Sequence, residues 1–135
     1  MLLSKRIFDK YKLLKLSNDP DIIINYIDSI DGNYIPTSML IDKARAIILS
    51  NNQKYSLEDA ENIFLSILEL DHDCIQVYIE LAYFYDSVMD DQKSALNFIE
   101  IGLKKAESTI NDLQEVKKDI LNYLITLKIY YKPVF

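Results

Sequence analysis

The chain has 135 residues, with 21 acidic and 15 basic side chains, so its formal net charge is −6; half of its residues are hydrophobic. This length suits one domain built around a single core. Two glycines cannot supply the many tight turns of a sheet-rich fold. An acidic chain is also a poor nucleic-acid ligand, because phosphates repel it. We therefore expect a single all-α domain spanning residues 1–135 that does not bind nucleic acid.

Cysteine usage and hydropathy give expectations about the compartment. The single cysteine cannot form an internal disulfide, which favours the reducing cytoplasm. The apolar stretch at the N-terminus is too short for a signal peptide, and no run approaches the roughly 18 apolar residues of a membrane span. We expect a cytoplasmic protein with no membrane partner. The abundance of Ile, Asn, Lys and Tyr suggests an AT-rich, bacterial genome.

Apolar residues recur at helical spacing along almost the whole chain. The first predicted helix starts at residue 3 and ends before Ser17. The second spans residues 20–31, with Asn18 or Asp19 as its N-cap, Pro20 in its first turn and Gly32 after its end. Its isoleucines, residues 22–24, could instead form a buried strand.

The remaining pattern predicts five more helices. The third begins at residues 36–38 and weakens at residues 51–52, and the fourth, fifth and sixth span about 57–70, 75–88 and 93–107. A seventh, capped by Thr109 or Asn111, reaches about Tyr130. Its apolar stripe is the clearest in the chain and consists of Leu113, Val116, Ile120, Leu124 and Leu127. The links are short, so consecutive helices should pack as antiparallel neighbours.

Two of these helix pairs carry a 34-residue pattern. The run Tyr78-x-x-Leu81-Ala82-x-x-Tyr85, followed by Ala95, Ile99 and Gly102, resembles the tetratricopeptide repeat, and Ala60 and Phe64 fit the unit before it. The resemblance is best over residues 57–107. It implies antiparallel helix pairs stacked as a short right-handed solenoid of about seven helices. The units would be 37–70 and 75–107, with a degenerate pair at 3–32 and a C-terminal capping helix at 110–131.

The sequence also departs from the repeat pattern. Ala44 stands where an aromatic residue belongs in the earlier unit, and His72 and Glu107 replace the closing proline of each unit. An irregular helical bundle therefore remains the alternative fold.

One cluster, residues 71–74 (Asp-His-Asp-Cys), could suggest a metal site. Four consecutive residues in a turn cannot all point at one ion, because zinc ligands usually converge from separated positions. We expect the aspartates and His72 to cap helix ends and Cys74 to pack as a small apolar side chain. No nucleophile elbow or phosphate-binding loop is present. The sequence thus predicts a non-enzymatic protein without catalytic residues, cofactor or metal.

The charge is concentrated in one segment. Residues 56–100 contain eleven acidic side chains against one basic one, Lys93, so this segment carries −10. A solvated surface is the ordinary interpretation of such a run. A focused negative potential would also attract a basic partner, with nearby tyrosines as anchors.

The family resemblance implies which positions line an inner groove. These are Asp42, Arg45, Leu49 and Asn52, then Gln76, Ile79, Tyr83 and Asp86, then Asn111, Gln114, Lys118 and Leu121. Relatives that grip C-terminal carboxylates use lysine and asparagine there, whereas this chain offers Leu49, Glu80 and Glu115 at clamp positions, which makes that role improbable. The predicted partner-binding residues are Arg45, Gln76, Ile79, Tyr83, Asp86, Asp90, Asp91 and Lys118.

The leading hypothesis is a non-catalytic adaptor that binds a basic protein or peptide, for example an immunity protein or a secretion-type chaperone. The alternative is a self-assembly module that forms a homo-oligomer through the C-terminal helix and tail. In that case residues 130–135 would dock on a second copy; otherwise Val134 and Phe135 would fold back onto the last helix. The expected state is a monomer or a weak homodimer.

Overall fold

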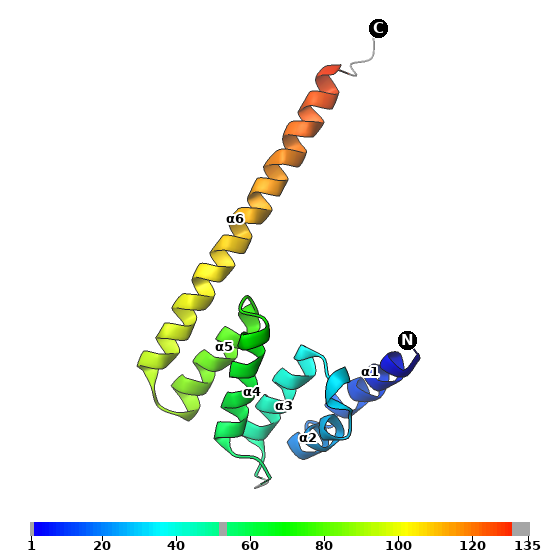
Figure 1. Cartoon of the computed structure of the whole chain (residues 1–135), viewed down its shortest axis with the longest axis vertical. Coiled ribbons are helices and arrows are strands. Elements are labelled where there is room, and N and C mark those ends of the chain that lie inside the picture. The colour runs from blue at the N-terminus through cyan, green and yellow to red at the C-terminus, as the bar shows by residue number, and fades with distance from the viewer. Residues whose placement is uncertain (1, 52–53, 131–135) are drawn as a thin grey trace.

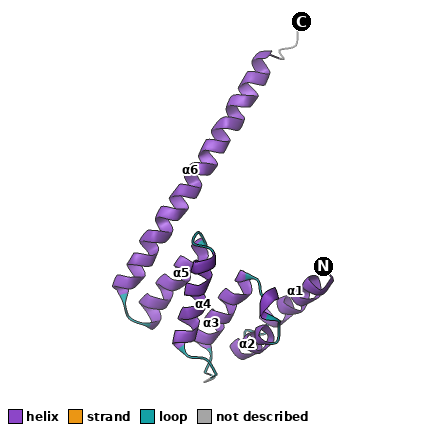
Figure 2. Ribbon diagram, in the orientation of Figure 1, coloured by secondary structure: helices purple, strands orange, loops and turns teal. Residues whose placement is uncertain are grey.

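The computed structural model describes residues 2–51 and 54–130, which form six α-helices and two short turns of other helix types, with no strand (Figures 1 and 2). The α-helices are α1 (Leu2–Lys15), α2 (Pro20–Asp28), α3 (Thr37–Leu49), α4 (Leu57–Leu70), α5 (Ile75–Tyr83) and α6 (Gln92–Tyr130). A 3-10 turn, η1 (Gly32–Tyr34), follows α2, and a π-helical turn, η2 (Phe84–Val88), follows α5. The all-α prediction is confirmed for the described residues.

Local capping sets several helix starts. The Asp19 carboxylate accepts the Asp21 N–H at 3.0 Å, and Pro20 occupies the first turn of α2. At α4, Ser56 and Asp59 exchange hydrogen bonds as a capping box, with Asp59 N to Ser56 Oγ at 3.2 Å and Ser56 N to Asp59 Oδ2 at 2.7 Å. Residues 22–24 lie inside α2, so the alternative of a buried strand there is wrong.

Helices α1 to α5 stand in a row, each packed against the next in the chain (Figure 1). The main core lies between α2, α3, α4 and α5 and is centred on Phe64 and Leu81, both fully buried. Tyr11, Ile27 and Met39 form a smaller cluster where α1 meets α2 and α3. Helix α6 packs on the last member of the row, α5, and on the turn η2.

A partly buried ion cluster joins α2 to α3 and to the loop before α4. The Asp28 carboxylate accepts Lys43 Nζ at 2.7 Å, Lys54 Nζ at 2.8 Å and the Tyr55 hydroxyl at 2.7 Å. Burial alone would raise the pKa of Asp28, but these three hydrogen bonds lower it below its usual value. The cluster therefore stabilises the ionised carboxylate in the folded protein.

The predicted break between a sixth and a seventh helix is wrong. Residues 92–130 form one helix of 39 residues. The Thr109 hydroxyl donates to the Lys105 carbonyl at 3.2 Å inside this helix and caps nothing. No glycine or proline lies between Gly102 and Tyr130, so no residue there stops the helix.

The distal half of α6, residues 110–130, does not lie over the helix row as a cap. It extends past the row into solvent (Figure 1), and every residue from Glu107 to Thr126 is exposed. The predicted apolar stripe is real, but its members Leu113 and Ile120 are 65% and 54% exposed. The expectations for Asn52 and for the tail after Tyr130 fall outside the described residues.

Candidate protein-interaction site

A groove runs between α5 and the first turns of α6. Its cavity volume is about 390 Å³, and it is lined by Ile79, Ala82, Tyr83, Asp86, Gln92, Ala95, Leu96 and Ile99. The small side chains Ala82 and Ala95 form its buried floor. Tyr83 and Leu96, 66% and 62% exposed, stand on opposite helices. The groove thus offers an apolar surface wide enough for a side chain of a partner.

The π-helical turn η2 shapes the end of this groove. The Met89 N–H donates to the Phe84 carbonyl at 3.1 Å, which widens the last turn after α5. Asp90 then takes a left-handed conformation with φ of 53°, and the chain reverses into α6. Tyr85 in this turn stacks on Phe98 of α6 with ring centroids 5.4 Å apart. Burial, together with a hydrogen bond to Glu61, raises the pKa of Tyr85 to about 12.

Two acidic side chains stand at this end of the groove. Gln92 Nε2 donates to Asp90 Oδ1 at 3.0 Å and lies 3.4 Å from Asp86 Oδ1. None of the ion pairs in the described part of the chain involves Asp86 or Asp90. Their negative charge is therefore not neutralised by a neighbouring cation and adds to the negative potential at this end of the groove.

Asp91 has a different role from its two neighbours. Its carboxylate accepts the Ser94 N–H at 3.1 Å and the Ser94 hydroxyl at 2.6 Å at the start of α6. The hydrogen bonds from Ser94 lower the pKa of Asp91. Asp91 thus caps α6, which forms one wall of the groove, but does not line the groove itself.

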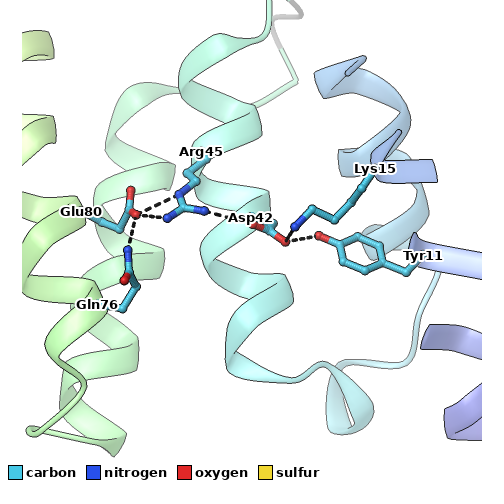
Figure 3. Close-up of polar contacts among 6 residues, drawn as sticks. All are labelled: Tyr11, Lys15, Asp42, Arg45, Gln76 and Glu80. Carbon is cyan, nitrogen blue, oxygen red and sulfur yellow. Dashed lines mark hydrogen bonds and ion pairs between the residues drawn. The ribbon is translucent and has the colours of Figure 1, made fainter. Parts of the chain in front are cut away.

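A chain of polar contacts crosses α1, α3 and α5 (Figure 3). Arg45 Nε donates to Glu80 Oε1 at 2.9 Å, and Gln76 Nε2 donates to the same oxygen at 2.8 Å. Arg45 Nη1 also lies 3.4 Å from Asp42 Oδ1, and Lys15 Nζ lies 3.0 Å from Asp42 Oδ2. Two carboxylates therefore balance the Arg45 guanidinium within the protein.

Tyr11 completes this chain of contacts. Its hydroxyl donates to Asp42, and burial together with this bond raises the pKa of the phenol. Because Asp42 and Glu80 already engage Arg45, this surface is a structural tie between helices. From the sequence, Glu80 was interpreted only as an acidic residue at a position where carboxylate-binding relatives need a basic one. In the structure it joins α5 to α3 through Arg45.

The structure separates the predicted partner-binding residues into groups. It brings Ile79, Tyr83 and Asp86 together in the groove, with Asp90 beside them. Arg45 and Gln76 meet on Glu80. Lys118 lies 22 positions beyond Leu96 on α6, which is roughly 33 Å along the helix axis.

Sequence reasoning missed Gln92 and Leu96. Both line the groove from the next helix. The repeat pattern assigns groove positions only to the first helix of each pair, so no signal in that pattern pointed to them.

Residues 71–74 form the turn expected from the sequence. Asp71 Oδ1 accepts the Asp73 N–H at 3.0 Å, and the His72 carbonyl accepts the Tyr78 hydroxyl at 2.8 Å. Cys74 packs against the main core. Over residues 2–51 and 54–130, no three potential ligand side chains lie together in a way that could hold a metal ion. Within the same ranges no helix has both the length and the apolar content needed to cross a bilayer.

Comparison with protein-family models, with curated proteins and with solved structures gives no significant match. The tetratricopeptide resemblance therefore stays a prediction from the sequence.

Proposed function

We propose that this protein is a non-catalytic interaction module whose groove between α5 and α6 binds a basic segment carrying an apolar anchor. The observation that carries this proposal is the combination of an open apolar groove with Asp86 and Asp90 at its end. An apolar anchor would occupy the space between Tyr83 and Leu96, because aromatic and aliphatic surfaces dominate binding energy at protein interfaces. Basic side chains beside it would meet the acidic end and gain speed of encounter from its potential.

A partner with this chemistry is compatible with two roles. One is an immunity protein that neutralises a basic toxin, and the other is a chaperone for a secreted substrate. Both require only binding, and neither requires a cofactor.

We further propose that α3–α4 and α5–α6 are tetratricopeptide-like units of a short right-handed solenoid. Support comes from the positions that the repeat pattern makes small. Ala60, Ala82 and Ala95 are buried, and Gly102 faces the Tyr78 ring where α6 crosses α5. In such a repeat the groove would belong to the last helix pair.

A labelled peptide of alternating lysine and leucine tests the groove by fluorescence anisotropy, with a glutamate–leucine peptide as the charge-reversed probe. We expect the basic peptide to bind and the acidic one not to bind. Combining Asp86→Asn with Asp90→Asn should weaken binding roughly three- to tenfold and reduce its salt dependence, as expected for charges at an interface rim. Tyr83→Ala should weaken binding without changing the salt dependence.

The matched control combines Glu58→Gln with Glu69→Gln on α4. These residues are exposed and do not line the groove, and their replacement removes the same amount of charge. Equal loss of affinity in both double variants would mean that net charge alone attracts the peptide. Unchanged binding in Tyr83→Ala would contradict the groove as the site.

A second candidate function is self-assembly through α6. The observation that favours it is the apolar stripe on residues 110–127, whose members are exposed except for the half-buried Leu127 and are not covered by α1 to α5. A patch of this kind marks an interaction surface in soluble proteins. Sedimentation equilibrium over a range of concentrations tests it, and a strict monomer would exclude it.

A further inference from the structure

The distal stripe continues the side of α6 that packs on α5. Gly102 and Ile120 are 18 residues apart, which is five turns of an α-helix, so both point to the same side. Ala95 and Leu113 have the same separation. Helix α5 covers this side only as far as Ala106, which shares a small apolar pocket with Ile75, the first residue of α5. Beyond that level none of the described helices α1 to α5 covers the stripe.

We infer that the distal half of α6 pairs with the same segment of a second copy of this chain, antiparallel, about a two-fold axis beside Ile120. This inference deepens the proposed self-assembly function and rests on it. It specifies the partner, the orientation of the two helices and their register.

The spacing of the stripe supports the register. Leu113, Val116, Ile120, Leu124 and Leu127 are separated by three, four, four and three residues, a pattern that is symmetric about Ile120. In an antiparallel pair centred there, Leu113 lies level with Leu127 of the second copy, and Val116 lies level with Leu124. A two-fold interface needs such a self-complementary patch.

Packing around α5 supports the orientation. A second α6 that ran parallel and in register would have to lie against residues 92–106 of the first one. Helix α5 already covers that part of α6. In the antiparallel arrangement the described end of the second helix, Tyr130, reaches the level of Ile110, one turn above that limit. The second helix then occupies the stripe directly beyond the end of α5.

Charge supports the same orientation. In each copy, the segment 56–100, which carries −10, lies mostly in the row of helices α1 to α5. A parallel pair would set two such segments side by side. An antiparallel pair places them at opposite ends. Residues 107–130 themselves hold four acidic and three basic side chains, so the paired segments are nearly neutral.

The available area reaches what a specific interface needs. Residues 110–130 span about 30 Å, and half the lateral surface of a helix about 10 Å wide is then roughly 500 Å². A pair buries on the order of 1,000 Å², the lower limit for a specific interface. An interface at this limit is small, so we expect a weak dimer that dissociates on dilution.

The first test compares two isoleucines on opposite sides of α6. Ile120 lies at the centre of the stripe, whereas Ile125 is equally exposed but points about 140° away from it. In sedimentation equilibrium of the full chain, Ile120→Asp should raise the dimer dissociation constant at least about tenfold. Ile125→Asp should change it less than about twofold. Equal effects of both variants would overturn the inference.

The second test measures orientation with a short bismaleimide crosslinker in a Cys74→Ser background. Ile120→Cys should give crosslinked dimers, because the two thiols meet at the axis. Leu113→Cys alone should not, because its two copies lie about 21 Å apart along the helices. A mixture of Leu113→Cys with Leu127→Cys should crosslink.

The outcomes separate the inference from the function on which it rests. A parallel dimer would crosslink through each single cysteine and would overturn the inference while leaving self-assembly intact. A monomer at every concentration would overturn both. Peptide binding in the α5–α6 groove is independent of either result.

Discussion

Gly102 lies where α6 packs closely on Tyr78 of α5, and its replacement by alanine tests that packing directly. A Cβ atom at this position would lie 2.9 Å from Tyr78 Cβ and 3.4 Å from Tyr78 Cγ. Tyr78 cannot move aside easily, because it is buried and its hydroxyl is bonded to the His72 carbonyl at 2.8 Å. The methyl group of Gly102→Ala therefore forces the two helices apart.

Two opposing effects set the size of the change. Alanine favours the helix over glycine by about 1 kcal/mol. Overpacking of a closely packed site costs about 1–3 kcal/mol. The clash is with the root of a side chain rather than its flexible end, so the steric cost outweighs the helix gain. We expect Gly102→Ala to lower the free energy of unfolding by about 1 kcal/mol.

Urea unfolding followed by circular dichroism measures this change, at one protein concentration because dimerisation would shift the curve. Asn97 supplies the control, since it is exposed on the same part of α6. Asn97→Ala should be more stable than Asn97→Gly by about 1 kcal/mol. If Gly102→Ala is stabilised by a similar amount, the two helices do not approach as closely as the structure has them, and the reasoning fails.

Two further predictions concern the ion cluster and the continuity of α6. Asp28→Asn should lower the free energy of unfolding at neutral pH by about 1–3 kcal/mol, because Lys43 loses its carboxylate partner. The pKa of Asp28 is lower in the folded than in the unfolded protein, so the ionised carboxylate contributes its full stabilisation above a pH of about 4. This stabilisation disappears as the pH falls through the pKa that Asp28 has in the folded protein. The free energies of unfolding of the wild type and of Asp28→Asn should therefore converge in acid. Asn111→Pro should cost about 3 kcal/mol or more of helix stability and reduce the ellipticity at 222 nm, whereas a helix starting at Asn111 would tolerate proline in its first turn.

Local chemistry made part of the fold predictable. Asp19 with Pro20, and Ser56 ahead of an acidic first turn, predicted the starts of α2 and α4 because capping depends on a few neighbouring residues. The break at Thr109 was predicted on the same grounds and was wrong. A residue that can cap a helix can also lie inside one, and only a breaker or tertiary packing decides between the two.

The candidate site was predictable to a smaller extent. Ile79, Tyr83 and Asp86 were assigned to one surface, and the structure places them in one groove. Arg45 was assigned to the same surface, but its salt bridge with Glu80 joins helices 35 residues apart in the sequence. Helical periodicity shows which side of a helix is apolar, and it cannot show which partner covers that side.

The two proposed interactions can coexist, because they use different parts of α6. The groove involves α6 only between Gln92 and Ile99, whereas the antiparallel contact starts at Ile110. From Leu96 to the axis beside Ile120 is about 36 Å, so the two grooves of a dimer would lie roughly 70 Å apart along the helices. A short peptide cannot span that distance and should bind once per chain, with the same affinity in monomer and dimer. A long basic partner with two binding segments could occupy both grooves and gain avidity, and Ile120→Asp would then remove that gain without weakening the single contact.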